Sequence, residues 1–514
     1  MRYSRRTFLR LSGAAAITPA WGRLSLSADD TPALCRKLAD DPLRPQYHFL
    51  AAHNWMNDPN GPIFFRGRYH MFHQYNPQSA VWGNMHWAHA TSFDLIHWKH
   101  EPIAISPTAN GPDRDGVFSG SAIVDGTTPT VIYTGVAPPS SDAAATLRDG
   151  HHIWRETQCL AVAQDNDLRV WKKLADPVIA APPAGLEVTG FRDPYVWREG
   201  DRWMLILGSG IRYQGGAILL YTSPDLRHWT YLHPLVQGAP SGKDSANPVD
   251  TGDMWECPDF FPLGDKHVLL ISTMGKVCWK VGTYAQQRFT PEKEGVVDWG
   301  SYYAAKTMLD REGNRILWGW IPETRPDADL IAAGWAGAMS LPRVLSLNLQ
   351  NELQTEVSLA ANLLRSRRTT LTGTTQADRQ KALDSLRIQD LAAELHLRLQ
   401  PKSDAFTFTL KSEDGTPFVA ISCANKMNFR ELRINNIAVP LAGTSNSPVH
   451  LHMFLDGSVL EIFANESAAV TARVYLTPSG PLRLALASDV EILSLDAWQM
   501  GAISKNRLTS PLCA

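Results

Sequence analysis

The sequence predicts an all-β protein of two domains, a β-propeller followed by a β-sandwich. The first observation concerns residues 46–345, where short strands such as residues 68–72 (RYHMF) are separated by turns and no long stretch keeps a helical period. The second is a repeat, because residues 92–98 (SFDLIHW) return as residues 223–229 (SPDLRHW), with a weaker copy at residues 167–171. A strand–turn unit that recurs at blade-like intervals indicates a propeller. A sandwich is the alternative, but it would leave the repeated Asp-Leu-x-x-Trp unexplained.

The third observation concerns residues 385–503, where apolar and polar residues alternate. Residues 394–399 (ELHLRL) and 406–410 (FTFTL) are typical of half-buried antiparallel strands, and this predicts a β-sandwich. No acid there stands in a setting like those described below, so we expect this domain to give support or sugar contacts rather than chemistry. Residues 346–384 are polar with some helical pattern, and we expect them to connect the two domains.

The N-terminus is typical of an export signal. Arg5 and Arg6 stand in the segment SRRTFLR, which precedes an apolar run that is too short, and too interrupted by Pro19, to anchor the chain in a membrane. We therefore expect residues 1–28 to be a twin-arginine-type signal peptide. The mature protein is then expected to be periplasmic or secreted, without membrane association after the signal is removed.

Composition excludes some classes of partner. The formal net charge is −2 and no long segment is dominated by one sign, which argues against nucleic acid and anionic membranes. Many of the 17 Trp residues stand beside short polar residues, a combination that suits a small carbohydrate as substrate. The six cysteines form no CxxC pair, so the sequence predicts neither a zinc site nor a redox motif. It does not indicate an oligomeric state.

Three acids in the first domain share one local pattern, in which an aromatic residue lies nearby and a proline follows at once or one residue later. Asp58 stands in WMNDPNG, Asp193 in FRDPY and Glu256 in WECPD. Each has an ordinary structural interpretation: Asp58 as a turn former, Asp193 as an ion-pair partner of Arg192, and Glu256 as an acid at the end of a strand. In a propeller, however, the three would reach the mouth of the central channel from different blades.

Converging carboxylates without metal-ligand spacing suggest cleavage of a glycosidic bond. One acid attacks the anomeric carbon, a second protonates the leaving oxygen, and a third stabilises positive charge on the ring. Glu256 lies between Trp255 and Cys257 and is expected to face other carboxylates, so we expect it to hold its proton near neutral pH. Asp58 has amide groups on both sides and is expected to stay ionised.

These segments resemble the signature blocks of glycoside hydrolase family 32, the invertases, levanases, inulinases and fructan exohydrolases, also called β-fructofuranosidases. The matching blocks follow the family's order and span almost everything after the signal: WMNDPNG from Trp55, FSGSA from Phe118, FRDP from Phe191, WECP from Trp255, GWAG from Gly334 and FLDGSVLEIF from Phe454. The resemblance implies a catalytic five-bladed β-propeller at residues 46–345 and a C-terminal β-sandwich at residues 385–503. It also implies a retaining mechanism without metal or organic cofactor.

The resemblance implies a role for each matched residue. Asp58 is the implied nucleophile on the fructosyl anomeric carbon, and Glu256 is the general acid and then the base that activates water. Asp193 is implied to hold two ring hydroxyls and to stabilise the oxocarbenium-like transition state. The implied substrate-binding residues are Trp55, Asn57, Gln74, Trp82, Phe118, Ser119, Arg192 and Trp335. Asp115 and Asp259 lie in or beside matched blocks and are expected to be structural.

The implied activity is the release of terminal non-reducing β-D-fructofuranosyl residues from fructans, from sucrose or from both. The strand after the Glu-Cys block has Lys276 but lacks the acid that accompanies a lysine in sucrose-preferring plant members. This favours broad or fructan-directed exo-hydrolysis over a dedicated invertase. A fructosyltransferase and an endo-fructanase of the same fold are alternatives. A non-catalytic fructan-binding propeller is the alternative from another class, and the intact acid trio argues against it.

Overall fold

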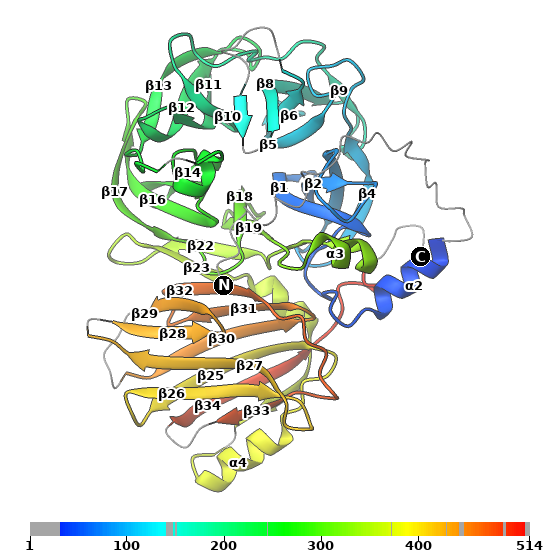
Figure 1. Cartoon of the computed structure of the whole chain (residues 1–514), viewed down its shortest axis with the longest axis vertical. Helices are drawn as coiled ribbons and strands as arrows, with labels where there is room; N and C mark the ends of the chain where they lie inside the picture. The colour runs from blue at the N-terminus through cyan, green and yellow to red at the C-terminus, as the bar shows by residue number, and fades with distance from the viewer. Residues whose placement is uncertain are drawn as a thin grey trace.

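The computed structural model consists of two β-domains, as Figure 1 shows. It describes residues 31–139, 147–149, 152–243, 245–371, 373–427, 429–441, 447–486 and 490–508. Five sheets of the first domain surround a central axis, and the two sheets of the second lie below them in Figure 1. The expected fold class, a five-bladed β-propeller followed by a β-sandwich, is confirmed. The expected signal peptide lies outside the described residues.

Each blade is a sheet of mainly antiparallel strands, numbered from the axis outward. The first contains β1 (Asn54–Phe65), β2 (Arg68–Asn76), β3 (His86–Ser92) and β4 (Trp98–Ile105), and the second contains β5 (Gly116–Asp125), β6 (Thr128–Ala137), β8 (His152–Ala163), β7 (Leu147–Asp149) and β9 (Trp171–Lys173). The third contains β10 (Val188–Glu199), β11 (Arg202–Ile211), β12 (Gly215–Ser223) and β13 (Thr230–Gln237). The fourth contains β14 (Glu256–Leu263), β15 (Lys266–Thr273), β16 (Lys276–Ala285) and β17 (Arg288–Val296). The fifth contains β18 (Tyr303–Leu309), β19 (Arg315–Ile321), β21 (Ala338–Met339), β22 (Arg343–Leu347) and β23 (Leu353–Val357).

The ring of blades is closed by pairing between the two ends of the domain. β20 (Trp335–Ala336) pairs in parallel with β1, so Trp335 lies opposite Asn54. The innermost strands β1, β5, β10, β14 and β18 contact one another in sequence around the axis. The strand that carries Asp58 is thus held between β2 and β20.

The Asp-Leu-x-x-Trp repeat forms the turn that leads into the outer strand of three blades. Its leucine has a positive φ in every copy, 70° at Leu95, 57° at Leu168 and 66° at Leu226. The indole N–H of the following tryptophan donates to the carbonyl of that leucine at 2.9–3.0 Å. The backbone turns in the same way each time, so the interpretation of the repeat as a blade signature is confirmed.

Every innermost strand contains a β-bulge near its start. At the bulge, the pairing with the second strand of the blade shifts register. From the first blade to the fifth, the shift lies between Met56 and Pro59, between Val117 and Gly120, between Arg192 and Tyr195, between Glu256 and Asp259, and between Tyr303 and Lys306. A bulge sets two residues against one and re-aims their side chains. In the last three blades the first bulge residue has a positive φ, at Asp193, Cys257 and Ala304. Five equivalent bulges therefore gather side chains at one end of the channel.

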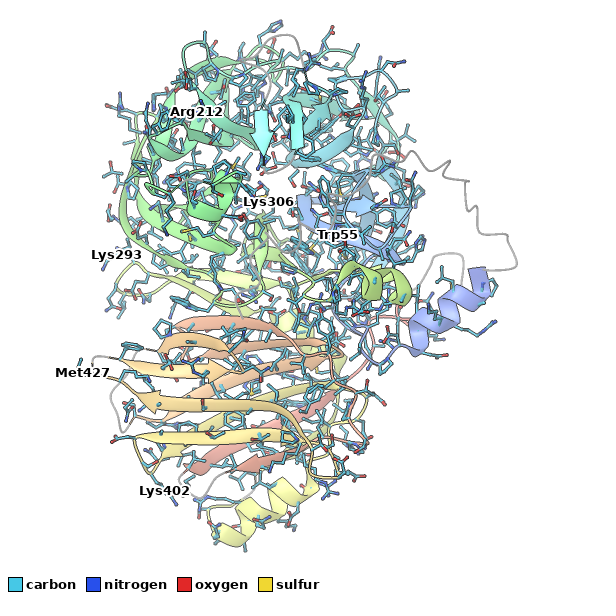
Figure 2. All side chains as sticks on the ribbon, viewed as in Figure 1. Trp55, Arg212, Lys293, Lys306, Lys402 and Met427 are labelled. Carbon is cyan, nitrogen blue, oxygen red and sulfur yellow. The ribbon has the colours of Figure 1, made fainter. Side chains whose placement is uncertain are left out.

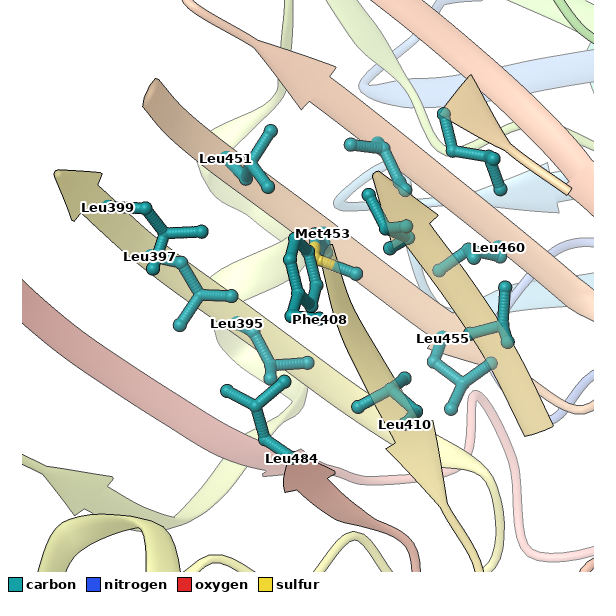
Figure 3. Close-up of a cluster of buried hydrophobic side chains, with 14 of the residues drawn as sticks. Leu395, Leu397, Leu399, Phe408, Leu410, Leu451, Met453, Leu455, Leu460 and Leu484 are labelled. Atoms are coloured by element: carbon teal, nitrogen blue, oxygen red, sulfur yellow. The ribbon is translucent and has the colours of Figure 1, made fainter. Parts of the chain in front are cut away.

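The sandwich has a six-stranded and a five-stranded sheet. In sheet order the first contains β24 (Arg365–Thr370), β34 (Val490–Met500), β25 (Ala392–Pro401), β30 (Val449–Asp456), β31 (Val459–Ala464) and β32 (Ala468–Arg473). The second contains β29 (Ile437–Leu441), β28 (Arg430–Ile434), β27 (Pro417–Asn425), β26 (Ala405–Lys411) and β33 (Arg483–Leu486). Leu395, Leu397 and Leu399 of β25 are fully buried, and Phe408 of β26 belongs to the same core cluster (Figure 3). The alternation therefore predicted the inner face correctly.

A buried network of charged side chains joins the domains. Asp456 of the sandwich accepts hydrogen bonds from the backbone N–H groups of three successive residues, Gln46 to His48, at 2.6, 2.8 and 2.8 Å. The His48 imidazole lies between Asp456 and Glu461, 2.9 Å from a carboxylate oxygen of each. Arg343 of the fifth blade lies 2.6 Å from Glu461. The segment that leads into β1 is thus fixed by the sandwich.

The domain boundary differs from the expectation. Residues 346–384 do not form a separate connecting unit, because β23 completes the fifth blade and β24 joins the six-stranded sheet. The two domains meet at the 3₁₀ helix η3 (Leu359–Leu364), and α4 (Gln376–Ser385) follows β24. The expectation was wrong because an edge strand with one solvated face is as polar as a linker.

Three further helices complete the described chain, namely α2 (Thr31–Asp40), η2 (Pro248–Thr251) and α3 (Asp327–Ala333). Cys35 on α2 is disulfide-bonded, which the sequence did not indicate. Within the described ranges, none of the helices has the length and apolar character needed to cross a membrane.

Candidate active site

Asp58 lies in the bulge of β1 and is partly exposed. Its Oδ1 accepts a hydrogen bond from the Asn57 side-chain amide at 3.1 Å, and its Oδ2 accepts one from the Ser119 hydroxyl at 2.6 Å. The Cys257 thiol lies 3.5 Å from the same Oδ2. Donors from two other blades and from β1 itself therefore fix the orientation of this carboxylate.

Asp193 occupies the bulge of β10 and is 3% exposed. Its Oδ2 accepts the backbone N–H of Cys257 at 2.9 Å, and the Cys257 sulfur is 3.4 Å away. The Asp193 backbone N–H donates to the Thr134 hydroxyl at 2.9 Å. One cysteine side chain therefore lies between the carboxylates of Asp193 and Asp58.

Glu256 is the last paired residue before the bulge of β14 and is 8% exposed. Its Oε1 accepts hydrogen bonds from Arg192 Nε at 3.1 Å and Nη2 at 2.9 Å, and its Oε2 accepts one from the Tyr303 hydroxyl at 2.6 Å. Arg192 also donates to Glu156 at 2.8 Å. Arg192, Glu256 and Tyr303 occupy equivalent positions in three consecutive blades, which explains why they meet.

The three acids interact electrostatically. Burial raises the pKa of Asp193 to about 7. The Arg192 guanidinium and, less strongly, the Lys306 ammonium oppose this effect, and the charges of Glu256 and Asp58 add to it. Burial, followed by the charges of Asp193 and Asp58, likewise raises the pKa of the Cys257 thiol well above its ordinary value. The thiol therefore keeps its proton and can donate a hydrogen bond to a neighbouring carboxylate. The expected protonation of Glu256 and ionisation of Asp58 stay predictions.

A chain of amide and hydroxyl groups links the first two blades around Asp58. Gln74 of β2 donates to Ser119 Oγ at 2.7 Å and accepts from the Asn57 amide at 2.8 Å. The indole N–H of Trp55 donates to Asn57 Oδ1 at 2.8 Å. Because Trp55 is fully buried, its influence on the pocket passes through Asn57. The structure thus brings together Asn57, Gln74 and Ser119, as expected.

Aromatic rings stand beside this network. Trp82 and Phe118 meet edge to face with ring centroids 6.0 Å apart, and Trp154 of β8 meets Phe118 at 5.3 Å. Phe118 lies in the bulge of β5 directly before Ser119, so the rings stand next to Asp58. Such rings offer an apolar face to a sugar beside polar groups that can fix its hydroxyls.

Trp335 does not join this group of side chains. It is 1% exposed, its indole N–H donates to Asp41 at 2.7 Å, and the Arg325 guanidinium lies 4.4 Å from the ring centroid. A contact between Trp335 and substrate stays a prediction, which this packing does not favour. Lys276 also lies elsewhere, since its ammonium donates to the backbone carbonyls of Trp299 and Gly300.

Of the two acids expected to be structural, Asp259 has structural surroundings, and a structural role of Asp115 stays a prediction. Asp259 is fully buried and accepts the backbone N–H of Thr307 at 2.6 Å, which ties the fourth blade to the fifth. Asp115 is exposed beside Arg114, 3.8 Å away.

Sequence reasoning missed three residues of the site. Glu156 holds Arg192 and the backbone N–H of Phe191, Tyr303 holds Glu256, and Trp154 extends the aromatic group. None of these three residues belongs to a segment in which an acid is followed by a proline at once or one residue later. Tyr303 could have been found by aligning the inner strands of the blades, because it precedes its bulge as Glu256 does.

A cavity of about 350 Å³ lies at the other end of the inner strands, lined by residues that follow the bulges, such as Tyr195, Asp259 and Lys306. Lys306 and Trp55 are both labelled near the middle of the propeller in Figure 2. The three acids do not line this cavity. Among the described side chains, the group of histidine and carboxylate residues with metal-ligand spacing belongs to the sandwich, away from these acids.

The arrangement has the parts that glycosidic bond cleavage needs. One carboxylate is partly exposed and firmly oriented, a second is held by Arg192 and Tyr303, and a third is buried and interacts electrostatically with both. These groups can attack a carbon, transfer a proton to a leaving oxygen and stabilise positive charge.

Two family descriptions match the chain. "Glycosyl hydrolases family 32 N-terminal domain" covers residues 48–357, and "Glycosyl hydrolases family 32 C terminal" covers residues 362–499. The gap between them falls at η3, where the structure also places the domain boundary.

Relatives with assigned activities match over most of the chain. The sucrose-6-phosphate hydrolase of Escherichia coli is 33% identical over 498 residues, which is 89% of this chain and 95% of that protein. The cell wall β-fructofuranosidase of Zea mays is 36% identical over 374 residues, 66% of this chain and 58% of that protein. The solved structure of fructan 1-exohydrolase IIa from Cichorium intybus matches with a TM-score of 0.74 at 26% identity, covering 90% of this chain and 98% of that chain.

Proposed function

Because the chain belongs to glycosyl hydrolase family 32, we propose that it is a retaining, exo-acting β-fructofuranosidase that releases terminal fructose from fructans and from sucrose. The observation that carries this proposal is the convergence of Asp58, Asp193 and Glu256 from the first, third and fourth blades. A binding protein would have no need for an oriented carboxylate opposite a carboxyl group held by an arginine and a tyrosine.

The first step forms a covalent intermediate. Asp58 attacks C2 of the terminal fructosyl unit while Glu256 gives its proton to the glycosidic oxygen. The bond between C2 and that oxygen breaks, the alcohol leaves, and an ester joins the fructosyl unit to Asp58. The buried Asp193 stabilises the positive charge that develops on the ring, and the Cys257 backbone N–H holds Asp193 in place.

The second step releases the sugar. Glu256, now a carboxylate, takes a proton from a water molecule as the water oxygen attacks C2. The ester bond breaks, so Asp58 returns as a carboxylate and Glu256 as an acid. Two displacements at C2 leave the configuration of the released fructose unchanged.

The proposed action on fructans as well as on sucrose rests on the side of the pocket beyond the fructose. Lys276 is tied to two backbone carbonyls, and the strand that carries it has no acid to pair with a glucose unit. A site without charged contacts to one leaving group accepts several, and this supports action on β-linked fructose chains as well as on sucrose.

The product profile on sucrose, inulin and levan tests the proposal. We expect fructose as the first product of inulin and levan, and methyl β-D-fructofuranoside when methanol is added, because methanol replaces water in the second step with retention. Lengthened oligomers would show a transferase, and mixed internal fragments an endo-acting enzyme. Fructan binding in calorimetry without turnover would overturn the enzymatic proposal.

We further propose that residues 1–28 direct twin-arginine export to the periplasm or beyond, on the basis of Arg5-Arg6 and the apolar run that follows. Replacing both arginines by lysine should leave the activity in the cytoplasmic fraction of a host with this pathway. Unchanged export of that variant would contradict the proposal.

A further inference from the structure

Three side chains on the outer face of the six-stranded sandwich sheet converge on one point. His396 of β25 and His452 of β30 are directly opposite in the strand register, and Glu394 stands two residues before His396 on the same face. The imidazole Nε2 atoms of His396 and His452 are 2.9 and 2.8 Å from Glu394 Oε1. All three potential ligand atoms lie within 4.8 Å of one another. The proposed reaction uses none of them.

We propose that Glu394, His396 and His452 form a binding site for a borderline divalent transition metal ion such as Zn²⁺. Two imidazoles and a carboxylate form a set that suits Zn²⁺, Ni²⁺ or Cu²⁺ better than Mg²⁺ or Ca²⁺. With metal–ligand bonds of about 2.0–2.2 Å, tetrahedral ligand atoms lie about 3.4 Å apart, so each nitrogen has to move by less than about 1 Å. The imidazoles are 33% and 24% exposed, so the ion enters from solvent and water completes its coordination.

The Nε2 atoms of both imidazoles are directed at one carboxylate oxygen, Glu394 Oε1. The rings of His396 and His452 have centroids 3.8 Å apart, where two charged imidazoles would repel each other. A metal ion in place of the Nε2 protons keeps both rings neutral and satisfies the carboxylate.

Arg365 supports the carboxylate from the other side. Its Nε donates to Glu394 Oε2 at 2.6 Å, and its guanidinium lies 4.0 Å from the Trp498 ring centroid. A hydrogen bond to the non-ligating oxygen orients a metal-binding carboxylate. Another guanidinium nitrogen lies 2.5 Å from Oε1, so Arg365 also competes with the ion. We therefore expect micromolar rather than tighter affinity.

A bound ion would link two central strands of the sandwich next to the propeller. His452 contacts the ring of Phe454, at a centroid distance of 4.5 Å, and Phe454 packs in a cluster with Tyr47 of the segment that leads into β1. Because an ion that binds only the folded state stabilises it, the effect should appear as a higher Tm.

The test uses the full chain, freed of metal with a chelator and dialysed. We expect one Zn²⁺ per chain in calorimetry, a tetrahedral visible spectrum with Co²⁺, and a Tm several degrees higher with Zn²⁺. His396→Gln and His452→Gln should each weaken Zn²⁺ binding at least tenfold and remove the Co²⁺ spectrum. The matched control is His450→Gln, because His450 is exposed two residues earlier on the same strand and face.

Two results would overturn the proposal. One is equal Zn²⁺ binding by the wild type and the double variant His396→Gln/His452→Gln, and the other is the absence of a tetrahedral Co²⁺ spectrum in the wild type. Far-UV circular dichroism confirms that each variant is folded. Sugar release is measured separately, so failure of the proposed function and failure of the metal site are distinguished.

Discussion

The innermost strands of the propeller and the central strands of the sandwich differ in the regularity of their pairing. β25 pairs with β30 without a register shift and with β34 with a single shift near its end, between Arg398 and Leu399, and leucines fill its inner face. The inner strand of every blade contains a shift, and buried polar side chains such as Asp193 and Glu256 stand beside it. Largely regular pairing builds a core, whereas the proposed catalytic groups occupy the places where pairing is interrupted.

The largest expected effect comes from the acids at the bulges. Asp58→Asn removes the proposed nucleophile and should lower kcat by about 10⁴-fold or more, and Glu256→Gln should lower it by about 10²–10⁴-fold on sucrose. Tm should change by only a few degrees, because neither side chain fills the core. Asp115→Asn, at an exposed acid of the same domain, is the control and should keep full activity. Near-normal turnover of either acid variant would remove it from the mechanism.

Asp193→Asn should separate activity from stability. Loss of the buried charge should lower kcat by about 10²–10³-fold. The folded-state pKa of Asp193, about 7, lies above its ordinary 3.8, so the wild type loses stability as pH rises between these values. The variant avoids this loss, and its Tm should exceed that of the wild type at pH 8 but not at pH 4. An equal Tm difference at both pH values would contradict this account.

Tyr303→Phe tests a residue that only the blade alignment reveals. Removal of the hydroxyl takes away the hydrogen bond that Tyr303 donates to Glu256 Oε2 at 2.6 Å. We expect kcat to fall about tenfold with little change in KM, since Tyr303 orients the acid rather than the sugar. Tyr302→Phe, at the neighbouring buried ring, is the control. A change confined to KM would instead assign Tyr303 to substrate binding.

The smallest expected effect lies at the domain interface. Burial lowers the pKa of His48, but hydrogen bonds to Asp456 and Glu461 outweigh it and raise the pKa to about 8, from the ordinary 6.5. The resulting stability, about 2 kcal/mol, is complete below pH 6.5 and is lost as pH rises through 8. In His48→Gln the fall in Tm between pH 6 and pH 9 should be smaller. Parallel curves for the two proteins would show that His48 does not titrate in this range.

Much of the fold could be predicted because strand alternation and the Asp-Leu-x-x-Trp turns are local patterns. The acids were found for the same reason, since a proline beside Asp58, Asp193 and Glu256 marks the strand irregularity. Asn57, Gln74 and Ser119 also meet as expected.

Other features depend on contacts between distant segments. Glu156 and Tyr303 carry no local mark, and only the superposition of blades shows that Tyr303 corresponds to Glu256. Trp335 resembles a sugar-binding residue in sequence, but its indole N–H is used by Asp41, which lies 294 residues earlier. The strand β24 is polar because it forms a sheet edge, so composition alone could not assign it to the sandwich.

The closure of the ring has a consequence for synthesis. β1 and its proposed nucleophile emerge early from the ribosome, but its parallel partner begins at Trp335 and the anchor of the preceding segment is Asp456. A nascent chain therefore carries Asp58 on a strand that lacks this partner and this anchor until translation is nearly finished. Truncated products should be inert toward sugars even when they contain all three acids.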